Sequence, residues 1–340
     1  MTTKTITVPR DYTLDNTIKF VNSLNDAPEV DEYIFDFQDP GFLTPFGMLF
    51  IACAIRSFLN NRNESHVIPT NYENYYAGHM GFSQACGFEI GKIPGEAKGS
   101  SSYLPITIVN IADLLEEART ELVEIGEVIE MRSKELSKVL TQQENGTIID
   151  MITYVLREMI RNAIEHSESE FVAYSAQYMP RSKRAEIAIL DTGIGIRKSL
   201  SNNPYLTMNN DRDAINYALM PGVSGKMFKG IKRDPYSIWQ NSGYGLYGVS
   251  RLCGIGGKFF ICSGNVGLSL KPKKRAYYET QFQGTALRLN LSPKNINHLH
   301  PVLSGIMKEG DKFARQVSGD EDIPASTASQ MLASEFRKKH

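Results

Sequence analysis

The sequence predicts a mixed α/β (α+β) protein with more than one domain. Strand and helix signals alternate over residues 1–108, whereas residues 145–292 combine two helices with several strand-like segments. A run with helical spacing, residues 109–144, connects these parts, and a charged tail, residues 293–340, follows them. A chain of 340 residues is long enough for two domains, and its 41% hydrophobic content is ordinary for globular cores.

The composition excludes several broad classes of partner. A net charge of −1 creates no overall field that would attract nucleic acid or an anionic membrane, so neither partner is indicated. The apolar stretch Phe46–Ile55 is too short to span a bilayer. The first residues lack the apolar core of a signal peptide. We therefore expect a cytoplasmic protein, which agrees with four cysteines that lack metal-ligand spacing: Cys53, Cys86, Cys253 and Cys262.

The first 108 residues are expected to form a small α/β layer domain. Thr44-Pro45 is a typical helix start, with threonine as the N-cap and proline at the first helical position. The expected strands, recognised by short apolar or β-branched runs, are Thr5–Val8, Tyr33–Phe37, His66–Ile68 and Leu104–Val109. The expected helices are Thr13–Leu24, Thr44–Asn60 and Tyr72–Cys86.

Residues 110–140 are expected to form one long helix. Their apolar residues recur at alternating three- and four-residue steps: Leu115, Ala118, Leu122, Ile125, Ile129, Leu136 and Val139. Such a stripe either packs against the chain's own domains or pairs with a second copy to give a homodimer, and both interpretations stay open here.

The second half is expected to begin with a helix over Thr147–Ser167 and to contain a further helix that starts near Tyr244. The polar, irregular residues 197–241 are typical of a functional lid. The tail after residue 292 is expected to be partly disordered or to act as a docking arm. The expected strands are Phe171–Tyr178, Arg184–Leu190, Lys258–Cys262, Ala276–Phe282 and Thr285–Leu291.

Two side chains on the first of these helices have the chemistry of phosphoryl transfer. Glu158 and Asn162 lie four residues apart, hence on one helical face. An asparagine oxygen can bind a divalent metal that bridges phosphate oxygens, and a carboxylate one turn away can orient or deprotonate a water or hydroxyl. His166 follows on roughly the same face and could contact phosphate or the lid. The alternative is an ordinary polar helix face with a helix-end histidine.

Two strand ends offer groups that suit a nucleotide base. Asp191 follows an apolar strand and could accept the exocyclic amine of adenine, while Gly193 and Gly195 let the backbone approach closely. Thr285, which follows Gly284 at the start of another strand, could hydrogen-bond this aspartate directly or through water. The alternative is a plain strand-to-turn transition and an ordinary β-branched strand residue.

The segment Ser242–Gly248 has glycine spacing suited to phosphate. It lacks the preceding strand and the following acid of a dinucleotide-binding fingerprint. Gly243, Gly245 and Leu246 instead suit a loop that leads into a helix N-terminus, where free N–H groups and the helix dipole bind anions. Lys226, in the expected lid, is a further candidate phosphate ligand.

Taken in order, these four motifs resemble those of the GHKL superfamily, which includes gyrase-type topoisomerases, histidine kinases and anti-sigma-factor serine kinases. Glu158–Asn162 is similar to its N box, Asp191–Gly195 and Ser242–Gly248 to its two glycine boxes, and Gly284-Thr285 to its final motif. The resemblance implies a Bergerat-fold α/β sandwich with a mixed sheet, and Mg²⁺ with ATP under the lid. It implies that Asn162 holds magnesium, Glu158 is the base and Asp191 binds adenine.

Residues 1–108 resemble STAS domains, the fold of anti-sigma-factor antagonists. The similarity rests on Phe35-Asp36, on Thr44–Gly47 at a helix start, and on Met80–Phe82. In such antagonists a serine near that helix start accepts phosphate from a GHKL kinase. Thr44 is the nearest equivalent here, although the aspartate-serine pair expected before it is absent.

Three functions follow from these resemblances. The first is an ATP-hydrolysing conformational switch that regulates a protein partner. The second is a serine/threonine kinase of the anti-sigma type, and the third a non-catalytic nucleotide-binding adaptor. Residues 110–140 contain no histidine of the kind that sensor kinases phosphorylate, and no transducer domain is recognisable after residue 292, so the sensor-kinase and topoisomerase functions are disfavoured.

Overall fold

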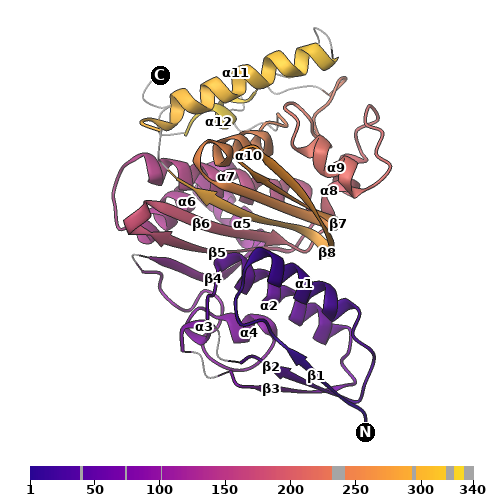
Figure 1. Cartoon of the computed structure of the whole chain (residues 1–340). Coiled ribbons are helices and arrows are strands. Elements are labelled where there is room, and N and C mark those ends of the chain that lie inside the picture. The colour runs from indigo at the N-terminus through magenta and orange to yellow at the C-terminus, as the bar shows by residue number, and fades with distance from the viewer. Residues whose placement is uncertain are drawn as a thin grey trace.

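The computed structural model confirms the mixed α/β class. It describes residues 1–38, 41–72, 75–100, 102–231, 242–292, 296–318 and 325–332. A parallel three-stranded sheet has the order β1-β2-β3, and a second sheet has the order β4-β5-β6-β8-β7. Two layers of helices cover the opposite faces of the second sheet (Figure 1).

The three-stranded sheet alternates with helices as expected. Thr13 caps α1 and Thr44 caps α2 through their side-chain oxygens. The single helix expected from Tyr72 to Cys86 is wrong, because Gly81 at φ +79° separates two short helices. The elements are β1 (Thr3–Thr7), α1 (Leu14–Asn25), β2 (Glu32–Asp36), α2 (Pro45–Asn60), β3 (His66–Thr70), α3 (Tyr75–His79) and α4 (Phe82–Cys86).

The second sheet, its helices and the C-terminal elements follow. They are β4 (Tyr103–Asn110), α5 (Ile111–Glu121), α6 (Ile125–Thr141), α7 (Thr147–His166), β5 (Phe171–Met179), a 3-10 turn (Pro180–Ser182), β6 (Arg184–Asp191), α8 (Gly195–Leu200), α9 (Asp211–Ala218), α10 (Gly245–Gly256), β7 (Lys258–Lys271), β8 (Lys274–Leu291), α11 (Leu299–Ser318) and α12 (Thr327–Gln330).

The second sheet is antiparallel at every pairing that the structure describes, so the expected mixed sheet is wrong. Two of these pairings have a local cause, because β5 with β6, and β7 with β8, are hairpins joined by short turns, and a tight hairpin imposes antiparallel pairing. The two strands expected at Ala276–Phe282 and Thr285–Leu291 form the single strand β8, which continues past Gly284.

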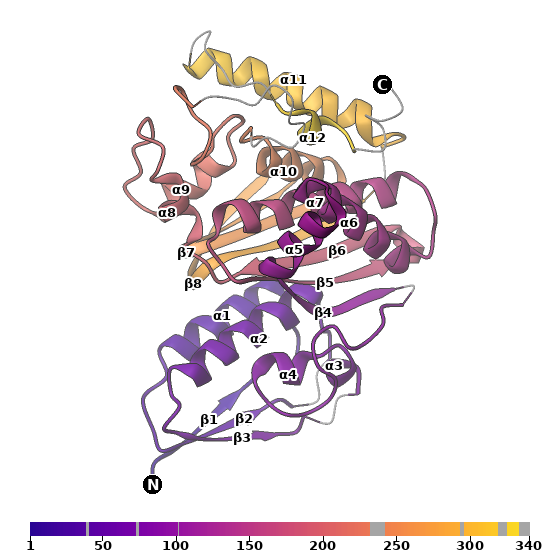
Figure 2. The same ribbon diagram turned by 180° about the vertical axis from the view of Figure 1, so that it is seen from behind.

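Strand β4 belongs to this second sheet rather than to the N-terminal layer in which it was expected. It pairs with β5, and its residues 104 and 107 flank a register shift. Helices α1 and α2 lie between the two sheets (Figure 2). Phe46 packs edge-on against Phe260, with ring centroids 5.4 Å apart, and Phe50 lies 4.8 Å from Phe282. The N-terminal layer therefore shares its core with the second sheet.

Strand β6 explains how one sheet supports both layers. Ile187 and Ile189 pack into the core beneath α7 and α10, whereas Ala188 and Leu190 pack into the core of α1 and α2. Side chains alternate between the faces of a strand, so the uninterrupted apolar run Ile187–Leu190 fills both cores. The last residue of β6, Asp191, follows this run at the strand's end.

The single helix expected over residues 110–140 is also wrong. Leu122 adopts a left-handed conformation with φ +55°, and the chain reverses into α6. Ala118 and Ile129 face the chain's own core, whereas Leu122 is 92% exposed. The apolar stripe therefore does not form one continuous seam, and much of it packs within this chain.

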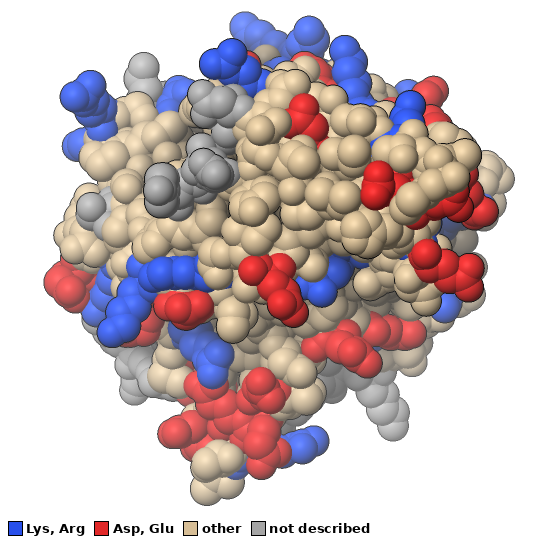
Figure 3. Space-filling view, turned by 90° about the horizontal axis from the view of Figure 1, so that it is seen from below, with Lys and Arg blue, Asp and Glu red and all other residues tan. Residues whose placement is uncertain are grey.

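The C-terminal tail is largely ordered where the structure describes it. Helix α11 packs over α10, and the segment 325–332, which includes α12, lies between α11 and the helical layer (Figure 1). No described helix is long and apolar enough to cross a membrane. On the face seen from below, basic and acidic side chains are interspersed, with acids gathered at one margin (Figure 3).

Candidate functional site

The predicted site residues converge on one cavity in the second half of the chain. It lies among α7, the end of β6, the lid base at residues 223–225, the start of α10 and strand β8. Its empty volume, which includes open solvent at its mouth, is about 930 Å³. The predicted residues that line it are Glu158, Asn162, Asp191, Gly243, Gly245, Leu246 and Thr285.

Asp191 is a buried carboxyl group at the cavity wall, with only 6% of its surface exposed. It sits directly across the sheet from Thr285, and its Oδ1 accepts the backbone N–H of Gly193 at 3.0 Å. Burial raises its pKa to about 6, although the N–H groups of Gly193 and Thr285 lower it in part. Asp191 and Thr285 are therefore neighbours across the sheet, as the predicted hydrogen bond between them requires. A carboxylate placed this way can accept an amine N–H from a ligand.

Gly193 and Gly195 shape the wall but are not among its lining residues. A Cβ on Gly193 would lie 1.9 Å from the carbonyl oxygen of Ser167, which accepts the N–H of Ile194 at 2.7 Å. Gly284, with φ +99°, lets β8 pass close to the backbone of Asp191. A Cβ on Gly284 would lie 2.1 Å from the carbonyl oxygen of Asp191. These glycines fix the position of Asp191 through close backbone packing.

Replacing Gly193 with alanine is expected to destabilise the fold by about 1–3 kcal/mol, because the new methyl group overlaps the α7 C-terminus. Gly254→Ala is the matched control, since nothing lies within 4 Å of its Cβ position in the exposed part of α10. That control should be neutral or stabilising. Urea denaturation of both variants measures the difference, and equal stabilities would contradict the close packing at Gly193.

The glycine-rich segment joins the lid to α10. Gly243 has φ +72°, and its Cβ position is 2.6 Å from the carbonyl oxygen of Val223 in the lid base. Gly245 begins α10, and its Cβ position is 2.5 Å from Glu158 Oε2. Lys226 is exposed and does not line the cavity, although its charge reaches His166. The α10 N-terminus therefore opens beside α7, as an anion site requires.

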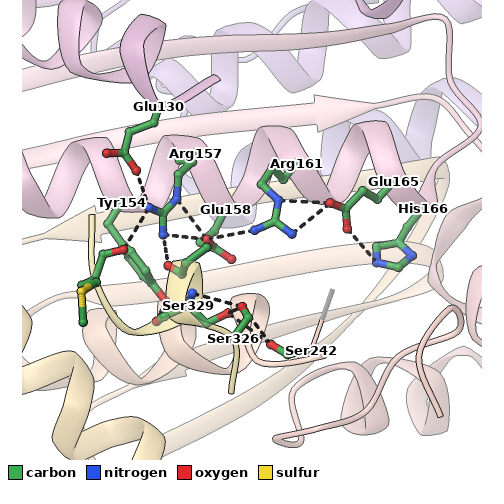
Figure 4. A network of polar contacts seen from close by, with 12 residues as sticks. Glu130, Tyr154, Arg157, Glu158, Arg161, Glu165, His166, Ser242, Ser326 and Ser329 are labelled. Atoms are coloured by element: carbon green, nitrogen blue, oxygen red, sulfur yellow. Dashed lines mark hydrogen bonds and ion pairs between the residues drawn. The ribbon is translucent and has the colours of Figure 1, made fainter. Parts of the chain in front are cut away.

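The cavity-facing side of α7 carries a ladder of ion pairs (Figure 4). Arg157 Nη2 is 2.9 Å from Glu158 Oε1, and Arg161 Nη1 is 3.7 Å from the same oxygen. Arg161 Nη2 is 2.9 Å from Glu165 Oε1, and the other oxygen of Glu165 is 3.9 Å from His166 Nε2. Glu158 is only 3% exposed, and its other oxygen, Oε2, faces Gly245. One oxygen is thus held and the other directed toward the glycine segment.

Two lining residues of this ladder, Arg161 and His166, extend the predicted site. Arg161 was not predicted, although its position beside Asn162 was a usable signal. His166 lines the cavity, so the helix-end interpretation is incomplete. Burial lowers the pKa of His166, Glu165 opposes this, and the charges of Lys226 and Arg161 lower it further. Burial and the two cations therefore favour the neutral form of the imidazole.

The C-terminal segment 325–332 is the part of the site that sequence reasoning missed. Ser329 lines the cavity, and its Oγ is 3.3 Å from Ser242 Oγ. Tyr154 Oη donates to the Ser329 carbonyl at 3.0 Å, and Arg157 donates to the carbonyls of Ala328 and Met331. These anchors are main-chain acceptors, which leave no residue pattern that could have signalled them.

Thr44 lies apart from the cavity. It is 2% exposed, its Oγ1 donates to the Tyr12 carbonyl at 2.9 Å and accepts the Gly47 N–H at 3.0 Å. Its N-cap role is therefore confirmed, and its hydroxyl group is committed to two hydrogen bonds within the N-terminal layer.

The chain was also compared with known proteins. No protein-family model matches the sequence, and no curated protein matches it.

Proposed function

We propose that residues 145–292 bind ATP with Mg²⁺ in the manner of GHKL proteins, and that the chain is an ATP-hydrolysing switch that regulates a protein partner. The observation that carries this proposal is the convergence of four motifs, spread over about 130 residues, on one cavity. Asp191 and Thr285, paired across the sheet, suit adenine, and the glycine segment at the start of α10 suits phosphates.

The donor set of the cavity fits a magnesium ion that arrives with nucleotide phosphates. Within the described residues, no three His, Cys, Asp or Glu side chains gather as a metal site of their own. Asn162 lines the cavity and offers one amide oxygen, which matches the small protein share that Mg²⁺ usually takes in nucleotide sites. When bound, the ion would neutralise charge on the phosphates.

Glu158 has the geometry of a positioned base. Arg157 holds Oε1, while Oε2 faces the glycine segment, so this oxygen can accept a proton from a water molecule beside the terminal phosphate. Nucleotide bound against the lid base at residues 223–225 would alter the surface near α9, and a protein partner would detect that change.

The test uses purified full-length protein with Mg²⁺ and γ-labelled ATP, and follows release of phosphate. Glu158→Gln is expected to keep nucleotide affinity and lose about 100-fold or more in turnover, as removal of a general base does. Glu170→Gln, on an exposed carboxylate outside the cavity, is the matched control and should turn over normally. Asn162→Ala should lose the magnesium-dependent part of binding. Unchanged turnover in Glu158→Gln would exclude it as the base.

A serine kinase is the second candidate, and one observation favours it. A hydroxyl group, that of Ser329, lies in the cavity wall beside the glycine segment.

A further inference from the structure

The segment 325–332 is fixed in place by its backbone and its apolar side chains. Tyr154 and Arg157 donate to three of its carbonyl groups, those of Ala328, Ser329 and Met331. Ala325 and Leu332 are buried in the core of the helical layer, and Ala328 is also buried. None of these anchors uses a serine side chain, and the hydroxyl groups of Ser326 and Ser329 lie beside that of Ser242 (Figure 4).

The Ser329 hydroxyl lies where the proposed function puts the phosphates. It lines the cavity, and its oxygen is 3.3 Å from that of Ser242, the residue before Gly243. The third serine of the group, Ser326, has its oxygen 3.1 Å from that of Ser329. Because the proposed function assigns the phosphates to the glycine segment and the α10 N-terminus, a nucleotide bound in this way would place its phosphates beside Ser329.

The candidate base and the segment that carries this hydroxyl group are joined by one guanidinium. Arg157 Nη2 is 2.9 Å from Glu158 Oε1 and also donates to the carbonyl of Ala328, the residue before Ser329. Nucleophilic catalysis requires a nucleophile and a base that are positioned beside the reacting atom. Both Glu158 and Ser329 line the cavity, and Arg157 holds the Glu158 carboxylate and the Ser329 segment in one network. Thr44, in contrast, has its hydroxyl group committed within the N-terminal layer.

We propose that Ser329 accepts the γ-phosphoryl group of ATP bound to the same chain. The bond from Ser329 Oγ to the γ-phosphorus forms while the bond from that phosphorus to the β–γ bridging oxygen breaks. ADP leaves with the bridging oxygen, and the hydroxyl proton passes to Glu158 and then to solvent. The products are ADP and phosphoserine. This inference rests on the proposed ATP site and names the acceptor for its kinase form.

The expected consequence is release of the segment. A phosphoserine carries about −1.5 to −2 charges at neutral pH. Placed at a buried position, in the wall of the cavity that Glu158 also lines, this charge opposes the docking of residues 325–332. The C-terminal segment would then become the part of the molecule that a partner detects.

The experiment incubates the full chain with Mg²⁺ and γ-labelled ATP, quenches it with acid, and maps protein-bound label by mass spectrometry. We expect label on Ser329, up to about one per chain, with a rate constant that does not change over a 100-fold range of protein concentration. Ser329→Ala should lose at least 100-fold of this labelling. Ser182→Ala, at an exposed serine outside the cavity, is the control and should keep it. Mapping the label on the wild-type protein tests the proposal even if a variant fails to fold.

The outcomes separate this inference from the function on which it rests. Release of free phosphate without protein-bound label would overturn the Ser329 assignment and leave the ATPase intact. Label on another residue, or a rate that rises with protein concentration, would also overturn it. No nucleotide binding by calorimetry would overturn both proposals together.

Discussion

Replacing Asp191 with asparagine is expected to weaken adenine-nucleotide binding by about 10- to 100-fold. A hydrogen bond to a charged group contributes about 1.5–3 kcal/mol, and the asparagine amide turns an N–H donor toward a ligand that also donates. Binding by the wild-type protein should itself weaken as the pH falls below about 6, because the carboxylate that accepts the ligand amine becomes protonated. Calorimetric titrations at pH 5 and 7.5 measure both effects.

The same variant should stabilise the ligand-free protein at neutral pH. The folded-state pKa of Asp191 is raised from 3.8 to about 6, mainly by burial. The stability contributed by this group is therefore fully present at low pH and is lost as the pH rises through about 6. The loss is up to about 3 kcal/mol, at 1.36 kcal/mol per pKa unit. Asparagine avoids it and keeps an oxygen that can accept the Gly193 N–H.

Urea denaturation at pH 4.5 and pH 7.5 tests whether the free energy of unfolding changes with pH in this direction. The gain in stability of Asp191→Asn over wild type should be larger at pH 7.5 than at pH 4.5. Asp113→Asn, on an exposed position of α5, is the control and should show no such gain. If Asp191→Asn were less stable than wild type at pH 7.5, the carboxylate would stabilise the fold. That result would contradict our interpretation that this buried carboxylate destabilises the ligand-free protein and serves ligand binding.

The convergence of the site could be predicted because each motif is local. The spacing of Glu158 and Asn162 fixes their common helical face, and the end of an apolar strand places Asp191. The glycine segment predicts a loop that leads into a helix. Once one sheet orders these pieces, the cavity that contains Glu158, Asn162, Asp191 and Thr285 follows.

The predictions that were wrong concern features that depend on contacts between distant segments or on one backbone angle. The apolar period continues unchanged through Leu122, so nothing in the spacing marks the left-handed residue that separates α5 from α6. The pairing of β4 with β5 depends on tertiary packing, because the residue pattern of a strand does not determine which strand lies next to it in the sheet. The segment 325–332 is short and lacks periodicity, and its partners are side chains of α7.

Replacing Arg157 with methionine is expected to destabilise the protein by about 3–5 kcal/mol, the usual cost of removing one partner from a buried ion pair. Arg157 has no exposed surface and contacts the carboxylates of Glu130 and Glu158 as well as the carbonyls of Ala328 and Met331. Methionine fills similar space but leaves two buried carboxylates and two carbonyl groups without these donors.

Arg132→Met is the comparison, because Arg132 pairs with Glu117 in a largely solvated position and should lose no more than about 1 kcal/mol. Urea denaturation measures both variants. The double variant Glu130→Gln/Arg157→Met should recover part of the loss, since residues in one network do not act additively. Faster proteolysis within residues 325–332 should accompany the Arg157 change. A loss of less than 1 kcal/mol with an intact C-terminal segment would mean that the apolar anchors alone hold this segment, and Arg157 would then no longer link it to Glu158.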